Sequence, residues 1–242
     1  MELPKVKSRI DGFDEVLGGG IPKGSVVLVT GLPGTMKSSL AWAFLVNAAR
    51  EEGAKGLYVS LEQTRPSLEN QMGAMGFDTD RARESIHILD LGTIQKELGR
   101  SATKPWMEFL RRTVETKKKI DGVDLVVIDS LEALDVLAKF EDRRTDLFHL
   151  FEWLRGLGAT AFVLTESPPE PFVPILDPSS QPRDDAGYLA DGIVHLKLHP
   201  VSDVEMQRRV RIVKMRGANH KTGFYALMFE GGRFSVTPAM SA

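Results

Sequence analysis

The chain contains no cysteine, and this absence excludes disulfide bonds, thiolate metal sites and cysteine nucleophiles. No segment approaches the roughly 18 consecutive apolar residues of a membrane span, and the opening MELPKVKSRIDG lacks the apolar core of a signal peptide. The formal net charge is only -2, so the chain as a whole has no positive excess to attract nucleic acid or anionic lipid. We therefore expect a cytoplasmic protein that does not enter membranes and does not bind nucleic acid.

The composition is that of an ordinary globular protein. Hydrophobic residues make up 42% and charged residues 26% of the chain, which argues against disorder and against a fibrous protein. A chain of 242 residues can bury one large core, and α/β folds often reach this length as a single domain. No linker, internal repeat or low-complexity tract marks a boundary, so we expect one domain over residues 1–242.

Short apolar runs bounded by turn residues predict buried β-strands. There are four of them: SVVLVT (25–30), GLYVSL (56–61), DLVVID (124–129) and TAFVLT (160–165). Between them, apolar residues recur at helical spacing over residues 40–49 and 147–157. Strands that alternate with helices predict a mostly parallel sheet covered on both faces, with ligands at the carboxyl ends of the strands.

The character of the chain changes after the fourth strand. Residues 167–185 are rich in Pro, Asp and Ser, and three further strand patterns follow: GIVHLKLH, RRVRIVKMR and FYALMFEGGRFSV. The last of these contains Gly231-Gly232 and predicts a hairpin. The predicted fold class is therefore α/β, with a parallel core, flanking helices and C-terminal antiparallel or mixed strands.

The stretch GLPGTMKSSL (31–40) carries most of a phosphate-binding loop, whose pattern is Gly-x-x-x-x-Gly-Lys-Ser/Thr. A strand, a glycine turn and a helix in this order gather backbone N–H groups and the positive helix end around one point, which suits a phosphate chain. Lys37 would contact the β- and γ-phosphates, and the Ser38 hydroxyl would coordinate Mg²⁺. The predicted nucleotide-binding residues are Gly31, Gly34, Thr35, Met36, Lys37, Ser38 and Ser39.

Met36 occupies the position of the second glycine. If that position demands a positive φ, a residue with a Cβ costs roughly 1–2 kcal/mol, which corresponds to about a 5- to 30-fold loss of affinity. If the backbone there is helical, the penalty is mainly steric, and Gly34 with Thr35 can supply the close approach to phosphate. Binding is lost only if the methionine side chain fills the phosphate space. The alternative to a nucleotide site is a turn whose glycines serve geometry alone and whose Lys37 is solvated.

Acidic residues follow three of the predicted strands. Asp129 ends a strongly apolar run, and a carboxylate at that sheet edge can hold Mg²⁺, although Asp129 or Ser130 could instead cap the next helix. Glu62 follows the second strand and could orient or deprotonate a water against the γ-phosphate, or simply begin a helix. Glu166, after the fourth strand, is a weaker candidate for relaying the state of the γ-phosphate.

These residues together resemble a known family, the KaiC-like ATPases of the RecA superfamily, in particular the single-domain type of archaea and some bacteria. The resemblance runs over nearly the whole chain. It is carried by RIDGFDEVLGGGIPKGSVVLVTGLPGTMKSSL, LYVSLEQT, VDLVVIDSLEAL and, most specifically, KMRGANHKTGFYALMF (214–229). The resemblance implies a RecA-like P-loop NTPase core, an ATPase activity with Mg²⁺, and Glu62 as its catalytic glutamate.

The resemblance also implies an assembly. In that family the Lys-x-Arg pair contacts the γ-phosphate of the neighbouring subunit, so Lys214 and Arg216 are expected to act in trans within a homohexameric ring. Fixed positive groups at a transferring phosphoryl group are worth about 10³ to 10⁵ in rate. Without the resemblance, RRVRIVKMR is a strand that alternates basic and apolar residues and has one solvated face.

Two departures from the family pattern predict slow hydrolysis: Met36 in the phosphate loop, and Gln63 where some members carry a second glutamate. They also motivate an alternative, a non-hydrolysing scaffold that senses nucleotide and presents a ring surface to a signalling protein. Self-phosphorylation at Ser179 or Ser180 is a minor further option, because serines are common in loops.

A third alternative is a recombinase paralogue that binds single-stranded DNA through residues 167–185. The charges of this segment disfavour it, since one basic residue faces four acidic residues: Arg183 against Glu170, Asp177, Asp184 and Asp185.

Overall fold

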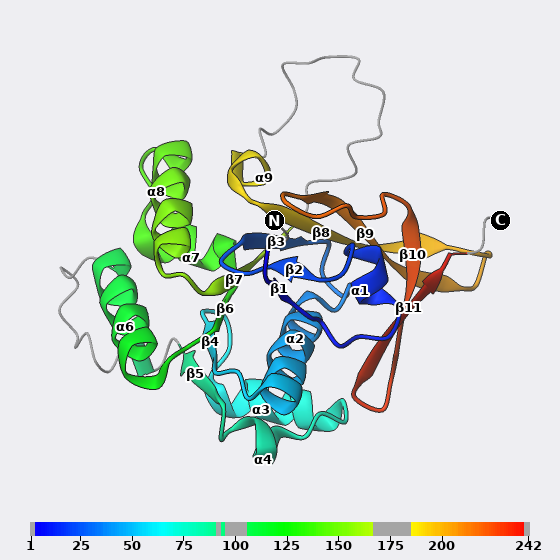
Figure 1. The fold of residues 1–242 in the computed structure, drawn as a ribbon, viewed down its shortest axis with the longest axis horizontal. Coiled ribbons are helices and arrows are strands. Elements are labelled where there is room, and N and C mark those ends of the chain that lie inside the picture. The colour runs from blue at the N-terminus through cyan, green and yellow to red at the C-terminus, as the bar shows by residue number, and fades with distance from the viewer. Residues whose placement is uncertain (1–2, 91–92, 95–105, 167–184, 240–242) are drawn as a thin grey trace.

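A nine-stranded β-sheet forms the centre of the molecule in the computed structural model, which describes residues 3–90, 93–94, 106–166 and 185–239 (Figure 1). The strands follow the spatial order β11-β10-β9-β8-β3-β7-β6-β4-β5. Their bounds are β3 (Val26–Thr30), β4 (Gly56–Ser60), β5 (Ile86–Asp90), β6 (Leu125–Asp129), β7 (Thr160–Thr165), β8 (Gly192–Pro200), β9 (Met206–Met215), β10 (Phe224–Glu230) and β11 (Arg233–Pro238). A separate two-stranded sheet pairs β1 (Lys5–Val6) with β2 (Ile21–Pro22).

The direction of the strands divides the sheet into two parts. From β8 to β5 all neighbouring strands pair in parallel. From β8 to β11 they pair antiparallel, and β10 and β11 form the hairpin predicted around Gly231-Gly232, with Glu230 opposite Arg233. The predicted α/β class with a parallel core and C-terminal antiparallel strands is therefore confirmed. The four strands predicted from apolar runs are confirmed to within one residue at each end.

Helices cover both faces of the sheet (Figure 1). One face packs against α1 (Phe13–Val16), α2 (Lys37–Glu52), α3 (Arg65–Ala74) and α4 (Thr79–Ala82). The other face packs against α6 (Trp106–Asp121), α7 (Leu131–Ala138), α8 (Arg143–Gly156) and α9 (Asp185–Leu189). Within the described ranges, no helix combines the length and the apolar character needed to cross a membrane.

Two-sided burial explains why the central strands are continuous apolar runs. Successive residues of a strand point to opposite faces, and in β3 Val27 and Val29 belong to one core cluster while Val26 and Leu28 belong to the other. All four side chains are fully buried. The strand β5 was not predicted, because at the sheet edge its sequence IHILD mixes apolar residues with the half-buried His87.

An aromatic stack fixes α2 on the sheet. The ring of Phe44 lies between Phe13, at a centroid distance of 5.9 Å, and Phe162 of β7, at 4.8 Å with an interplanar angle of 11°. All three side chains are at most 2% exposed. Because α2 carries the predicted phosphate loop at its start, this packing also fixes the position of the loop.

We predict that Phe44→Ala lowers the free energy of unfolding by about 3–5 kcal/mol, since it leaves a cavity between two rings. Urea denaturation followed by circular dichroism measures this loss. Phe148→Ala on α8 is the control, because Phe148 is 48% exposed and its removal should change the same quantity by less than about 0.5 kcal/mol. Equal effects of the two substitutions would contradict the packing described here.

Candidate functional site

The carboxyl ends of β3, β4 and β6 meet at one edge of the sheet. Pairing in the β4/β6 ladder sets Ser60 opposite Asp129, and the N–H of Leu61 donates to the carbonyl oxygen of Asp129 at 2.7 Å. Chain segments that leave these strands therefore start from the same edge. Of the predicted site residues, the structure brings together at this edge the loop 31–39, Glu62 and Asp129.

The loop between β3 and α2 is a compact turn with an open flank. Thr35 is buried, and its Oγ1 donates to the carbonyl oxygen of Leu32 at 2.8 Å. A Cβ on Gly31 would lie 2.6 Å from the carbonyl oxygen of Leu196, so the close approach of β8 requires glycine there. At Gly34, where φ is +82°, no described atom lies within 4 Å of a Cβ position. The loop thus leaves space on the side of Gly34, which a phosphate chain needs.

Met36 adopts the left-handed conformation, with φ 74° and ψ 32°, as the residue that precedes α2. Its side chain is half-buried and packs against the core cluster that includes α2. The left-handed backbone is part of the folded chain, so its cost belongs to the free energy of folding. The positive φ lowers the affinity for nucleotide, by about the predicted 5- to 30-fold, only if binding changes these dihedral angles. Packing of the side chain against the core also argues against the case in which it fills the phosphate space.

The start of α2 carries the donors expected for an anion. No side chain among the described residues caps the first N–H groups of this helix, which are those of Lys37, Ser38 and Ser39. The Nζ of Lys37 donates to the carbonyl oxygens of Gly31 at 2.6 Å and Leu32 at 3.4 Å, so the ammonium lies over the loop. The hydroxyl of Ser39 is buried and donates to Sδ of Met75 at 3.4 Å, which leaves its backbone N–H as the group available to a ligand.

Asp129 shares its carboxylate with a buried tyrosine. The hydroxyl of Tyr58 on β4 donates to Oδ2 of Asp129 at 2.5 Å. Burial raises the pKa of Asp129, and hydrogen bonds from Tyr58 and Ser38 lower it in part. Burial and the charge of Asp129 raise the pKa of Tyr58 well above its ordinary value, so Tyr58 stays a donor. Sequence reasoning missed Tyr58, although it lies in the quoted segment LYVSLEQT, two residues from Ser60 and on the same strand face.

Glu62 is exposed and its carboxylate is fixed by a neighbouring hydroxyl. Oε1 of Glu62 accepts a hydrogen bond from Oγ of Ser130. The same Oγ accepts the N–H of Ala133 at 3.3 Å and so caps α7, which settles the capping alternative in favour of Ser130 over Asp129. The peptide bond between Asp129 and Ser130 is cis. Glu62 does not begin a helix, since α3 begins at Arg65.

Glu166 is exposed at the end of β7, and its N–H donates to Oε1 of Glu132 at 2.9 Å. The same oxygen accepts a hydrogen bond from Oγ1 of Thr165 at 2.5 Å. These contacts connect β7 with α7, the helix that Ser130 caps. The relay proposed for Glu166 stays a prediction.

The donor set around Asp129 fits Mg²⁺ bound together with a nucleotide. The described residues contain no group of three or more His, Asp or Glu side chains that could hold a metal alone. Mg²⁺ does not need such a group, because it usually keeps several waters and binds one or two carboxylates together with substrate phosphates. The Ser38 hydroxyl and the Asp129 carboxylate, which interact with each other, offer two suitable oxygens.

Lys214 and Arg216 lie at the opposite end of the parallel strands, where their amino ends meet. In the β8/β9 ladder Lys214 is opposite Ile193 and Met215 is opposite Gly192, at the amino end of β8, whereas the phosphate loop follows Thr30 at the carboxyl end of β3. With a rise of about 3.3 Å per residue, the two ends of β3 are about 13 Å apart. The structure therefore does not bring Lys214 and Arg216 to the phosphate loop of their own chain.

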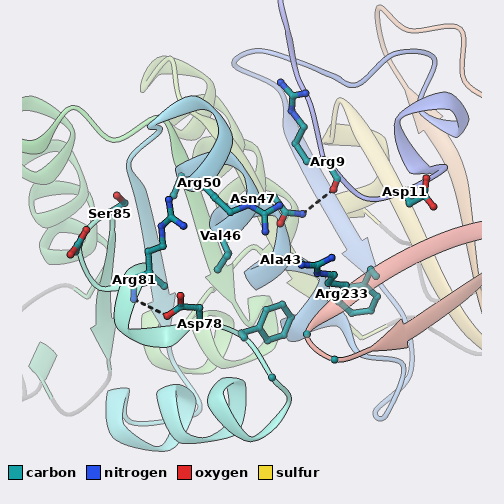
Figure 2. A pocket seen from close by; sticks show the side chains of 18 residues that line it. Arg9, Asp11, Ala43, Val46, Asn47, Arg50, Asp78, Arg81, Ser85 and Arg233 are labelled. Atoms are coloured by element: carbon teal, nitrogen blue, oxygen red, sulfur yellow. Dashed lines mark hydrogen bonds between the residues drawn. The ribbon is translucent and has the colours of Figure 1, made fainter.

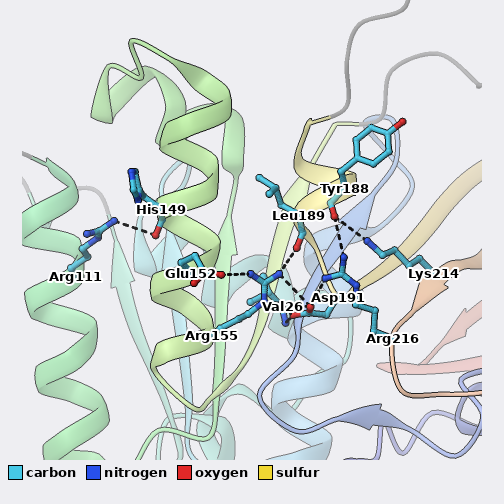
Figure 3. A network of polar contacts seen from close by, with 10 residues as sticks. All are labelled: Val26, Arg111, His149, Glu152, Arg155, Tyr188, Leu189, Asp191, Lys214 and Arg216. Carbon is cyan, nitrogen blue, oxygen red and sulfur yellow. Dashed lines mark hydrogen bonds and ion pairs between the residues drawn. The ribbon is translucent and has the colours of Figure 1, made fainter.

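Both basic groups are held at that end by hydrogen bonds (Figure 3). The Nζ of Lys214 donates to the carbonyl oxygens of Gly187 at 3.1 Å and Tyr188 at 3.2 Å. Nη1 of Arg216 donates to Oδ1 of Asp191 at 2.9 Å. The two side chains are thus anchored on α9 and on Asp191, the residue before β8. The alternative interpretation, in which they belong to a freely solvated strand face, does not describe them.

A cavity of about 720 Å³ lies apart from these residues, between α2, the segment after α3 and the β10–β11 hairpin (Figure 2). Its lining, as far as the structure describes the chain, includes none of the predicted site residues. Two of its arginines are paired with acids of α2, Arg9 with Glu52 at 3.4 Å and Arg50 with Glu51 at 2.8 Å. The cavity is therefore distinct from the predicted phosphate site.

Two sequence hypotheses fall on residues that the structure does not describe. Ser179 and Ser180 lie outside the described residues, and so does nearly all of the acidic segment 167–185. Phosphorylation at these serines stays a prediction.

Comparison with known proteins gives concordant results. A family model for the KaiC ATPase matches residues 6–240. The chain is 28% identical to the circadian clock protein KaiC2 of Synechocystis sp., covering 100% of this chain and 41% of that protein. It is 30% identical to a UPF0273 protein of Thermotoga maritima, covering 90% and 89%. The crystal structure of a KaiC-like protein from Pyrococcus horikoshii matches with a TM-score of 0.79 at 27% identity, covering 98% and 100%.

The chain thus spans about two fifths of the Synechocystis protein and most of the other two. The match to the Pyrococcus horikoshii structure confirms the predicted KaiC-like, RecA-type fold.

We predict that Met36→Gly is more stable than Met36→Ala by about 1–2 kcal/mol, because only glycine adopts the left-handed conformation without strain. Both variants lose the methionine side chain, so the difference isolates the backbone. Denaturation in urea measures it. The two variants should bind ATP with dissociation constants within about threefold of each other, since the strain precedes binding. Markedly tighter binding by the glycine variant would show that the strain does oppose the nucleotide.

Proposed function

The chain belongs to the KaiC family of ATPases, and we propose that residues 1–242 form one domain that binds ATP with Mg²⁺ and hydrolyses it slowly within an oligomeric ring. The observation that carries this proposal is the convergence of Lys37, Glu62 and Asp129 at one sheet edge, beside the uncapped start of α2. The three groups match the separate needs of phosphate binding, water activation and metal binding.

The phosphate chain would bind to the loop that begins at Gly31. Backbone N–H groups at the start of α2 and the open flank at Gly34 would receive it, and Lys37 would exchange the carbonyl oxygens of Gly31 and Leu32 for phosphate oxygens. Thr35 would keep the turn closed through its bond to Leu32. In this scheme the side chain of Met36 contributes packing alone.

The Ser38 hydroxyl and the Asp129 carboxylate would hold Mg²⁺. Bound there, the ion supplies positive charge that neutralises the phosphate oxygens as the terminal phosphoryl group departs. Tyr58 would orient the carboxylate, because its hydroxyl occupies one side of Oδ2. Burial raises the pKa of Asp129, and a cation bound beside it would favour the ionised carboxylate.

Glu62 would position and deprotonate the attacking water. Its carboxylate is exposed at the edge where Asp129 emerges, and Ser130 fixes one of its oxygens. The water oxygen would attack the γ-phosphorus while the bond to the β,γ-bridging oxygen breaks, and the proton would pass to Glu62. The products are ADP and phosphate.

Lys214 and Arg216 would complete the site of a neighbouring chain. Their location at the amino end of β8, across the sheet from the phosphate loop, supports a role in trans. A contact in which one side of a chain donates groups and the other side receives them is heterologous, and such contacts form a ring when the rotation between chains closes. We propose a homohexamer, as the resemblance implies, and a cytoplasmic location, as expected from the sequence.

A second candidate is the scaffold that binds ATP without hydrolysing it and presents a ring surface to a signalling protein. Gln63, the residue beside Glu62, favours the scaffold. Its Oε1 is buried and accepts no hydrogen bond from the described residues. Gln63 thus places a neutral amide where a second glutamate would place a carboxylate. The two functions differ in turnover and share the nucleotide site.

We predict that the purified, assembled protein releases phosphate from ATP in steady turnover, and that Glu62→Gln reduces the rate about 100-fold because the amide cannot accept a proton. A phosphate-release assay with Mg²⁺ measures the rate, and Glu141→Gln, an exposed acid outside the site, is the control. Undetectable phosphate release by the wild type, combined with ATP binding, would support the scaffold.

We predict that Arg216→Ala keeps ATP binding and lowers turnover about tenfold or more, because the arginine acts on the transition state of a neighbour. Calorimetry gives the affinity and phosphate release gives the rate. Arg208→Ala changes an exposed arginine on β9, the strand that ends just before Arg216, and should change neither quantity. Turnover that is unaffected by Arg216→Ala would remove this residue from the mechanism.

A further inference from the structure

Asp191 joins three parts of the chain through one carboxylate (Figure 3). It lies between α9 and β8, and its Oδ2 accepts the backbone N–H of Val26 at 3.0 Å and Nε of Arg155 at 3.0 Å. Its Oδ1 accepts Nη1 of Arg216 at 2.9 Å. The carboxylate therefore connects the first residue of β3, the helix α8 and the Lys-x-Arg segment.

The carboxylate is shielded and ionised. The side chain of Asp191 is 15% exposed, against 55% for Arg216. Burial by itself raises the pKa of Asp191, but the hydrogen bonds from Val26, Arg155 and Arg216 outweigh it and hold the pKa below its ordinary value. Hydrogen bonds between ionised partners are shorter and stronger than neutral ones. Asp191 is thus a fixed negative group against which the more exposed Arg216 is held.

Arg216 is anchored on one side and open on the other. Besides the bond to Asp191, its Nη2 lies 3.4 Å from the carbonyl oxygen of Tyr188. A guanidinium group has five N–H donors in a rigid plane, so these contacts leave donors for a phosphate. An arginine without an anchor samples many rotamers, and ordering it at every turnover would oppose stabilisation of the transition state.

We propose that Asp191 is the positioning residue of Arg216, which holds the guanidinium in the orientation that meets the γ-phosphate of the neighbouring chain. The inference rests on the proposed function, because it requires Arg216 to act on a neighbour's nucleotide. Asp191 does not itself contact that nucleotide. Its effect passes entirely through Arg216.

The backbone of Asp191 also fixes the position of Arg216 along the direction of β3. The N–H of Asp191 donates to the carbonyl oxygen of Val26 at 2.8 Å, and the N–H of Arg216 donates to the carbonyl oxygen of Asp191 at 2.8 Å. Together with the two side-chain bonds, these contacts tie Arg216 to the strand that carries the phosphate loop at its other end. The position of Arg216 is therefore linked, through β3, to the position of the phosphate loop in the same chain.

The test uses complementation between two defective chains. Asp191→Asn keeps the size and an acceptor for Val26 but loses the charge that holds Arg216. Alone, it should lower turnover about tenfold or more while the ATP dissociation constant stays within about threefold. Glu62→Gln chains have little turnover of their own but carry an intact Arg216. Rings co-expressed from equal amounts of both should regain about a quarter of the wild-type rate, since half the chains have an intact site and half of these have an intact neighbour.

Three controls separate the possible failures. Arg216→Ala co-expressed with Glu62→Gln tests action in trans without Asp191. Asp135→Asn breaks an exposed pair with Arg143 and should leave turnover unchanged. Asp191→Glu, which keeps the charge and lengthens the side chain by one methylene, enters the same mixture if Asp191→Asn does not fold. Particle mass is measured for every mixture.

The outcomes are distinct. Rescue of both Arg216→Ala and the Asp191 variant by Glu62→Gln supports the proposal. Rescue of Arg216→Ala alone overturns it, because Asp191 would then act on the structure of its own site through Val26. Failure of Arg216→Ala to be rescued removes the action in trans, and absence of hydrolysis in the wild type removes the proposed ATPase.

Discussion

The burial of the parallel strands on both faces is the constraint on which the rest of the molecule depends. Because α2 covers one face and α7 and α8 cover the other, β3, β4 and β6 have no freedom to slip, and a shift of one residue would turn every side chain to the wrong core. The carboxyl ends of these strands are thereby fixed at one edge. Asp129 ends β6, and Glu62 and Lys37 follow the ends of β4 and β3, so the packing of the strands determines how these three residues are placed relative to one another.

Met36 shows how a local rule can be broken without loss of the architecture around it. Its φ of 74° is unfavourable for a residue with a Cβ, yet its side chain packs against the core cluster that anchors α2. Part of the backbone cost is therefore offset by burial that glycine could not provide. Strain of this kind belongs to the folded state as a whole, and it acts on a ligand only if binding changes the strained dihedral angles.

The sequence predicted those features that depend on burial or on local order, and missed those that depend on register. The strands β3, β4, β6 and β7 were predicted because residues buried on both faces form continuous apolar runs. The edge strand β5 was not, since its polar residues interrupt the pattern. Tyr58 could not be assigned to Asp129 without knowing that β4 lies beside β6, which follows from the strand order and not from the spacing along the chain. Asp191 was missed for the same reason.

The separation of Lys214 and Arg216 from the phosphate loop has a consequence for assembly. The amino end of β3 lies near Asp191, and its carboxyl end leads into the phosphate loop. The extended strand holds these two ends apart. A single chain therefore keeps these two basic groups apart from its own phosphate loop. If the basic groups act on phosphate at all, they do so on another chain, and the rate of hydrolysis must then depend on how chains are arranged. The side chain of Arg216 is exposed, whereas its partner Asp191 is shielded and bonded to Val26 of β3. A contact between chains that moved Arg216 would therefore act, through Asp191, on the strand that carries the phosphate loop.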